Sequence, residues 1–112
     1  MVAAEAAAAG ALPVCADHSG LAEVAAALDE RMPAPAKGLT SFPLGLGSVE
    51  AIADRLNTWL GLAPDQRSEA SAALAATVAD LWSWQGVAKG IISASAGELE
   101  GLPKVPSDPA AK

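Results

Sequence analysis

The chain has 112 residues, a length typical of one domain, and a formal net charge of −6 from 13 acidic and 7 basic residues. This charge argues against an electrostatic nucleic-acid binder, whose affinity depends on clustered Lys and Arg side chains. Apolar residues make up 52% of the chain, but about a quarter of all residues are Ala and only 4% are aromatic. Alanine favours helix and buries little surface, so the composition predicts a helical protein with a thin core.

Cysteine and histidine each occur once, which limits the disulfides and metal sites that can form and bears on the cellular compartment that we expect. Cys15 and His18 stand alone, so the sequence excludes an intramolecular disulfide and any multi-Cys or multi-His metal site. We expect no metal, no cofactor and a reducing, cytoplasmic location. The apolar start lacks the basic residues of a signal peptide and contains Glu5. No charge-free run reaches the ~18 residues of a transmembrane helix, so no membrane-spanning segment is expected.

The first elements in chain order are a helix, a strand and a second helix. Residues 2–9 form an alanine-rich helix that Gly10 ends. The apolar run at 12–16 has no polar alternation, which is typical of a strand buried on both faces. Ser19 is expected to cap the helix predicted over 21–31, which has apolar residues at three- and four-residue spacing.

A second strand and a third helix follow a proline-containing loop. The strand is expected at 39–44, where Pro43 favours an edge position. Ser48 is the expected N-cap of a helix over 49–60. The apolar side of this helix, which we expect to face the core, consists of Val49, Ile52, Ala53, Leu56, Trp59 and Leu60.

Two more helices and a tail complete the chain. Pro64 is suited to the first turn of a helix that runs to about Trp82. Its expected inward residues are Ala70, Ala73, Leu74, Thr77, Val78 and Leu81. Ser83 is the expected cap of the last helix, over 84–96. The proline-rich residues 98–112 are expected to be a disordered tail.

This order of elements predicts a helix-dominated α/β protein. A strand, a helix and a strand in succession imply a parallel pair, here with about five helices around it. Two parallel strands alone make a poor sheet, because such sheets need both faces covered. Residues 1–97 are therefore expected to be the closing part of a larger Rossmann-like domain.

Three short motifs resemble those of family 4 glycosyltransferases, which have the GT-B fold. Residues 5–14, EAAAAGALPV, are similar to that family's passage of Glu-Ala, small residues, Gly and Pro-Val-Val, with one extra residue before the Pro. Residues 19–24, SGLAEV, resemble its Gly-Gly-x-x-Glu loop, and residues 81–88, LWSWQGVA, resemble the start of its last helix. The resemblance covers residues 1 to about 96.

The resemblance implies the transfer of a hexosyl group, with retention, from a nucleotide-sugar donor. Glu5 matches the second Glu of the family's donor motif, whose carboxylate accepts from the donor ribose hydroxyls. Val2 matches the stretch whose backbone amides approach the donor. Ser19 and Gly20 are expected to offer N–H groups at a helix N-terminus, and Glu23 is the remaining donor-binding candidate.

Several parts of the family's machinery have no counterpart in these residues. The first Glu of the donor motif and the Arg and Lys that hold the pyrophosphate would precede Met1. No catalytic residue is therefore assigned. We expect a truncated enzyme, begun at an internal Met and inactive alone, that pairs with a missing N-terminal domain or self-associates through the strand edge at 12–16.

Each candidate also has a structural explanation. Glu5 suits a solvated helix surface, Glu23 suits the positive end of a helix dipole, and Ser19 and Gly20 suit an ordinary turn. His18 has no partner at catalytic spacing, and Cys15 suits a small core hydrophobe. The alternative function is a small non-enzymatic helical interaction protein that uses a face bearing three tryptophans: Trp59, Trp82 and Trp84.

Overall fold

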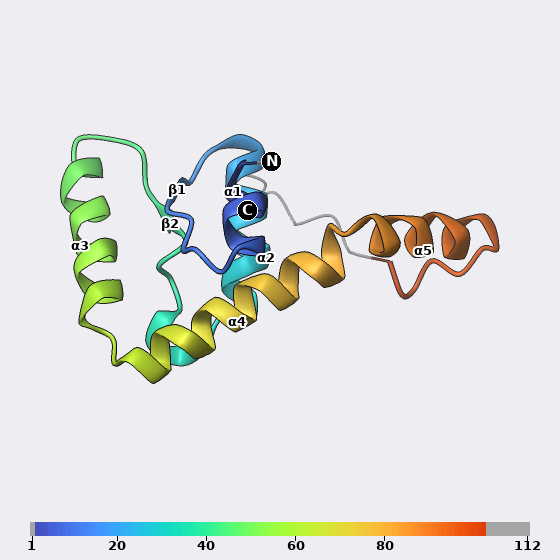
Figure 1. Cartoon of the computed structure of the whole chain (residues 1–112). Coiled ribbons are helices and arrows are strands. Elements are labelled where there is room, and N and C mark those ends of the chain that lie inside the picture. The colour runs from blue at the N-terminus through green and yellow to red at the C-terminus, as the bar shows by residue number, and fades with distance from the viewer. Residues whose placement is uncertain (1, 103–112) are drawn as a thin grey trace.

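A computed structural model of the chain describes residues 2–102 (Figure 1). Within that range the chain forms five α-helices, one short 3₁₀ helix and two strands. In chain order these are α1 (Val2–Ala8), β1 (Cys15–Ala16), α2 (Ser19–Glu30), η1 (Ala34–Ala36), β2 (Ser41–Phe42), α3 (Ser48–Gly61), α4 (Pro64–Leu81) and α5 (Trp84–Ser95). The predicted helix-dominated α/β class is confirmed. The predicted tail falls largely on residues 103–112, which lie outside the described residues.

The two strands pair in parallel, as predicted, and α2 connects them. Cys15 lies opposite Ser41, the Cys15 amide donates to the Thr40 carbonyl (2.9 Å), and the Asp17 amide donates to the Phe42 carbonyl (2.8 Å). Each strand has two residues, fewer than the expected 12–16 and 39–44. Pro43 follows β2 directly and has no N–H to extend the ladder.

The core is small and rich in alanine, as the composition predicts. Its main cluster joins α1, α2, η1, the segments that follow α2 and precede β2, and α4 through Ala7, Leu28, Met32, Ala36, Leu39, Ala70 and Leu74. A second cluster, Ala3, Cys15 and Ala25, lies between α1, β1 and α2. Alanine supplies three of the seven residues of the main cluster and two of the three of the second, so the chain segments approach closely at these positions, but each Ala contact buries little area.

A left-handed residue ends α1 and lets the chain turn back toward β1. Gly10 has φ +79°, a conformation that glycine adopts without a Cβ penalty. A Cβ atom at this position would lie 3.5 Å from the Cβ of Ser71 on α4. The turn therefore runs close along α4, with which α1 packs.

Two of the three expected serine caps are wrong. Ser19 lies inside α2, whose N-cap is His18, and no side chain caps that end. Gly47 is the N-cap of α3, and the Ser48 hydroxyl instead accepts from the Gly45 amide (2.9 Å), which holds the preceding loop. Ser83 does cap α5, where its Oγ accepts from the Gly86 amide at 3.0 Å.

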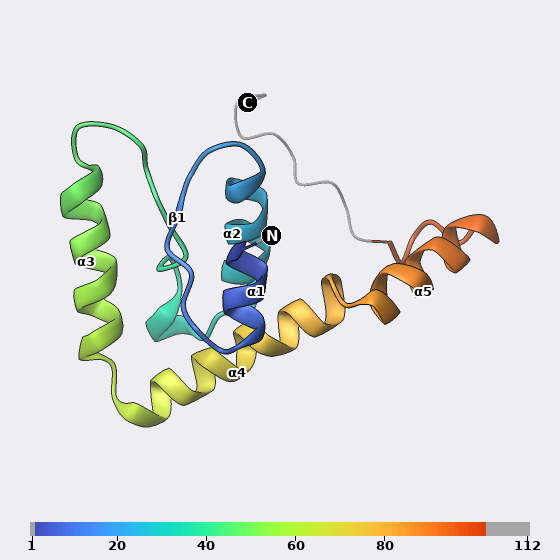
Figure 2. The same cartoon turned by 45° about the horizontal axis from the view of Figure 1, so that its top comes forward.

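The apolar side of α3 does not face the core as expected, and the other outer helix, α5, is equally open. None of the residues of α3 or α5, all of which the structure describes, is buried. Within the expected inward side of α3, Ile52 and Trp59 are half-buried, whereas Val49, Leu56 and Leu60 are exposed. Figures 1 and 2 show why: α3 flanks the body at one end of α4, and α5 extends beyond the other end.

Candidate functional site

The candidate donor site lies where β1 ends and α2 begins. In open parallel sheets, ligands bind at the carboxyl ends of the strands. Here β1 ends at Ala16, and the next four residues, Asp17 to Gly20, are all exposed. The structure thus places Ser19 and Gly20 on an open surface at the sheet edge where a ligand would be expected.

Ser19 has a backbone conformation that normally belongs to glycine. Its φ is +55°, and it is the one non-glycine residue with positive φ within residues 2–102. Such a conformation costs about 1–2 kcal/mol for a residue with a Cβ, and strained backbone of this kind clusters at functional sites. The matching position in the loop of the family that the sequence resembles is a glycine.

The first turn of α2 offers backbone donors toward the same surface. No side chain caps its amides, and the first helical bond, from the Ala22 amide to the His18 carbonyl, is long at 3.4 Å. A Cβ built on Gly20 would meet no atom within 4 Å. Free amides at a helix N-terminus favour an anion, and the open space at Gly20 lets a group come close to the backbone.

Glu5 and Val2 lie on the exposed side of α1, whose other side packs inward. Val2 is 79% exposed, and Glu5 is also exposed. Ala3 packs with Cys15 and Ala25, which holds the first turn of α1 beside β1 and α2. Figure 1 shows the N-terminal ends of α1 and α2 at the same end of the body.

The remaining carboxylate candidate lies in the second turn of α2. Because α2 begins at Ser19, Glu23 is further from the helix N-terminus than the sequence predicts, which weakens its interaction with the helix dipole. Across residues 2–102, no side-chain hydrogen bond or ion pair links Glu5, Ser19, Gly20 and Glu23 to one another. The site is therefore an open surface with separate polar groups.

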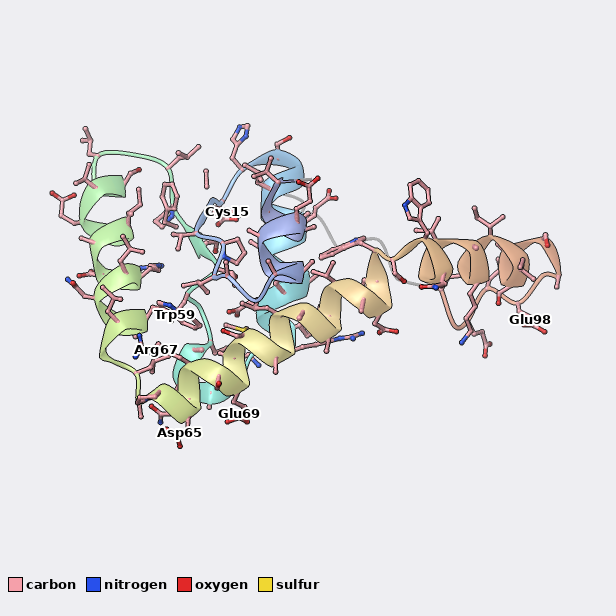
Figure 3. The ribbon with its side chains drawn as sticks, in the orientation of Figure 1. Cys15, Trp59, Asp65, Arg67, Glu69 and Glu98 are labelled. Atoms are coloured by element: carbon pink, nitrogen blue, oxygen red, sulfur yellow. The ribbon has the colours of Figure 1, made fainter. Side chains whose placement is uncertain are left out.

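Cys15 and His18 have different surroundings although they lie close in sequence. Cys15 is buried inside the body (Figure 3), and this burial raises the pKa of its thiol. A raised pKa keeps the thiol neutral and unreactive near neutral pH, in agreement with a role as a small core hydrophobe. His18 is exposed. No group of three or more His, Cys, Asp or Glu in the described chain is arranged to hold a metal ion.

Sequence reasoning missed a shallow hollow between α3 and the segment that precedes β2. Its lining residues are Gly38, Leu39, Asp54, Arg55 and Thr58. Arg55 is partly engaged there, because its Nε donates to the Ser41 carbonyl at 2.9 Å. The Gly38 amide donates to the carboxylate of Asp29, which lies at the C-terminal end of α2. The contacts join residues distant in sequence, so no local motif could have revealed the hollow.

The three tryptophans do not form one face. Trp59 and Trp82 are half-buried and pack against the main core, whereas Trp84 is 89% exposed on α5. The single tryptophan-bearing surface of the alternative hypothesis is therefore not present. The expected apolar strand edge is also largely covered, since Leu12 packs against the main core and Val14 is half-buried.

The chain matches no protein-family model, no curated protein and no solved structure. Within residues 2–102, no helix is both long enough and apolar enough to cross a membrane.

Proposed function

We propose that the chain is the donor-binding part of a retaining glycosyltransferase of the GT-B class and binds a nucleotide-sugar donor. The proposal rests on one observation above the others. Ser19, in a glycine-like conformation with φ +55°, and Gly20 follow a parallel strand and open a helix. The family to which the sequence is similar has two glycines in this place.

The geometry supports a division of roles among the candidates. The uncapped first turn of α2 suits a phosphate of the donor, because its amides are donors at the positive end of a helix. The exposed Glu5 suits the ribose, whose two vicinal hydroxyls donate to a carboxylate. Sugar transfer is not assigned to these residues, since the family's other donor-motif Glu and its basic pair have no counterpart among them.

Nucleotide titration of the ¹⁵N-labelled full chain, followed by NMR, tests this proposal. With UDP and with GDP we expect saturable shifts of the Ser19 and Gly20 amides, with a dissociation constant on the order of 1 mM. The interaction is expected to be weak because the surface is open and few groups contact the ligand. Absence of saturable shifts with both nucleotides would refute donor binding.

Two variants and a matched control locate the binding groups. Gly20→Ala adds a methyl group into space that is empty in the structure, so it leaves the fold intact but obstructs a diphosphate. Glu5→Gln removes the charge that the ribose contact needs. Each change is expected to weaken binding about tenfold, whereas Glu30→Gln, at the opposite end of α2, should leave it unchanged. Equal effects of all three variants would contradict the proposed site.

A further inference from the structure

The two strands end side by side, but the chain leaves them in opposite directions. Ala16 lies opposite Phe42, and the Asp17 amide donates to the Phe42 carbonyl at 2.8 Å, so the loops that follow begin next to each other. Helix α2, which follows β1, contacts both strands, whereas α3, which follows β2, contacts β2. Figures 1 and 2 both show the strand pair between these two helices. The two loops therefore lead to opposite sides of the sheet.

The separation of the two loops marks the place where parallel sheets bind ligands. In open sheets of this kind, a ligand lies outside the carboxyl ends of the strands, where the connections of neighbouring strands turn to opposite sides. The loop after β1 contains Ser19 and Gly20, which hold a phosphate in the proposed donor site. The loop after β2, residues 43–47, lies at the same end of the strands (Figure 1), and we name it the β2 loop. The β2 loop is thus the second segment that borders a ligand held at the start of α2.

The proposed donor contacts fix which part of the ligand reaches the β2 loop. Helix α1, which carries Glu5, packs against α2, so both lie on the same side of the strands, whereas the β2 loop leads to α3 on the other side. With the ribose at Glu5 and the diphosphate at the first turn of α2, the nucleoside lies on the side of α1 and α2. The hexosyl group is attached to the far phosphate, so it extends over the strand ends toward the β2 loop.

The β2 loop is open and offers uncharged groups. Leu44 and Leu46 are 58% and 107% exposed, and in the part of the chain that the structure describes neither of their amides makes a hydrogen bond. The Ser48 hydroxyl accepts from the Gly45 amide at 2.9 Å, which holds the loop in this shape. Sugar hydroxyls accept from backbone amides, and the C–H side of a sugar ring packs on an aliphatic side chain, so both kinds of group suit a hexose.

Charge restricts the kind of sugar that this end of the molecule accepts. No residue from 38 to 49 is charged, and the next residue, Glu50, lies in the first turn of α3. Among the described cations, Arg31 follows α2 and Lys37 precedes β2, so both lie at the other end of these elements. The Arg55 Nε donates to the Ser41 carbonyl, and the remaining described Lys and Arg residues lie on α4 and α5. A carboxylate on the sugar would therefore meet Glu50 without a compensating cation.

We propose that the β2 loop receives the hexosyl group of the donor and that this sugar is a neutral hexose, not a uronic acid. The inference rests on the proposed function, because Glu5 and the first turn of α2 set the direction of the donor. It adds a second contact region to the site and the chemical class of the transferred sugar.

The first test compares donors with and without the sugar, by NMR of the ¹⁵N-labelled full chain. UDP should shift the Ser19 and Gly20 amides alone, and UDP-glucose should shift these and also the Leu44 and Leu46 amides. GDP and GDP-mannose make the same comparison for a guanine donor. Binding of UDP-glucose without β2-loop shifts overturns this inference but leaves donor binding standing, and so do β2-loop shifts with UDP alone. Absence of saturable shifts with every nucleotide overturns both.

The second test measures the discrimination by charge. UDP-glucuronic acid is expected to bind roughly threefold to tenfold more weakly than UDP-glucose, because its carboxylate lies near Glu50. Glu50→Gln should reduce this difference without changing the affinity for UDP-glucose. Glu69→Gln makes the same change of charge at an exposed position of α4 and is the control, which should keep the difference of the wild-type chain. Equal affinities of the wild-type chain for the two donors contradict the proposed sugar class, and so do equal effects of the two variants.

Discussion

Helices α3 and α4 are neighbours in the chain, yet only α4 has buried residues, although its apolar and polar residues are less clearly separated than those of α3. Helix α4 has six Ala and eight polar or charged residues among its 18, and it buries Ala70, Leu74 and Thr77. Helix α3 separates its apolar and polar residues well, but none of its residues, all described, is buried. A clear apolar side indicates which residues lie together on a helix; it does not tell whether the same chain covers them.

The difference follows from what each helix contacts. Helix α4 packs on α1, α2 and η1, so its small side chains meet other helices closely. Helix α3 has its main contact with β2, a strand of two residues that can cover only a narrow strip. Burial here depends on the number of neighbours, and alanine allows more neighbours to come close.

The largest expected effect comes from truncation of a leucine on the core helix α4, compared with truncation of an exposed leucine on α3. Leu74→Ala removes a side chain with no exposed surface and leaves a cavity between α1, α2 and α4, so we expect a loss of about 2–5 kcal/mol in the free energy of unfolding. Leu60→Ala, at a position 66% exposed, should change it by less than about 1 kcal/mol. Urea unfolding at dilute protein measures both, and similar losses would contradict the assignment of α4 as the core helix.

Alanine substitution of two glycines in α5 distinguishes the start of the helix, which packs closely on the end of α4, from its middle, which has few neighbours. Gly86→Ala would place a Cβ 2.6 Å from the Asp80 carbonyl, so the corner between α4 and α5 must shift, at a cost of about 1–3 kcal/mol. Gly90→Ala meets only the Leu102 side chain at 3.7 Å and should stabilise the helix by up to about 1 kcal/mol. Hydrogen exchange of the α5 amides measures the stability of the helix in each variant. Faster exchange in both variants would contradict the opposite effects expected of them.

Removal of the ion pair at the end of α4 should have the smallest effect. Arg31 and Asp80 lie 2.7 Å apart, but their side chains are 46% and 64% exposed. Water and salt screen such pairs, so Arg31→Ala should cost less than about 1 kcal/mol, and the difference should shrink as salt is raised. Thermal unfolding at low and high salt provides the measurement. A loss as large as that of Leu74→Ala would mean that charge, rather than apolar burial, positions α4.

Much of the fold could be predicted because local signals and tertiary contacts agree. Gly10 ends α1, Pro64 lies in the first turn of α4, and Ser83 caps α5, as their chemistry predicts. Ser48 failed as a cap because its hydroxyl bonds to the loop before it, and Ser19 failed because α2 begins two residues earlier than expected. Local sequence does not distinguish these outcomes.

The site was less predictable than the fold. The exposure of Glu5, Ser19 and Gly20 follows from their polar character and turn position, and the structure agrees. Their spatial relation depends on how α1 packs beside α2, through contacts such as Ala3 with Ala25 that carry no sequence signal of their own. The left-handed backbone of Ser19 could not be anticipated from a residue that seldom adopts it.

The alanine-rich core has a thermal consequence. The heat capacity change of unfolding grows with the apolar area that becomes exposed, and a core in which six of the eleven buried apolar residues described are Ala exposes less area than a core of large side chains. A small heat capacity change gives a flat curve of unfolding free energy against temperature. Alanine also loses no side-chain rotamer freedom when it is buried. A thin core of this kind therefore lowers the height of the stability curve while broadening it, so that cooling destabilises the protein less than it would a protein with a core of large side chains.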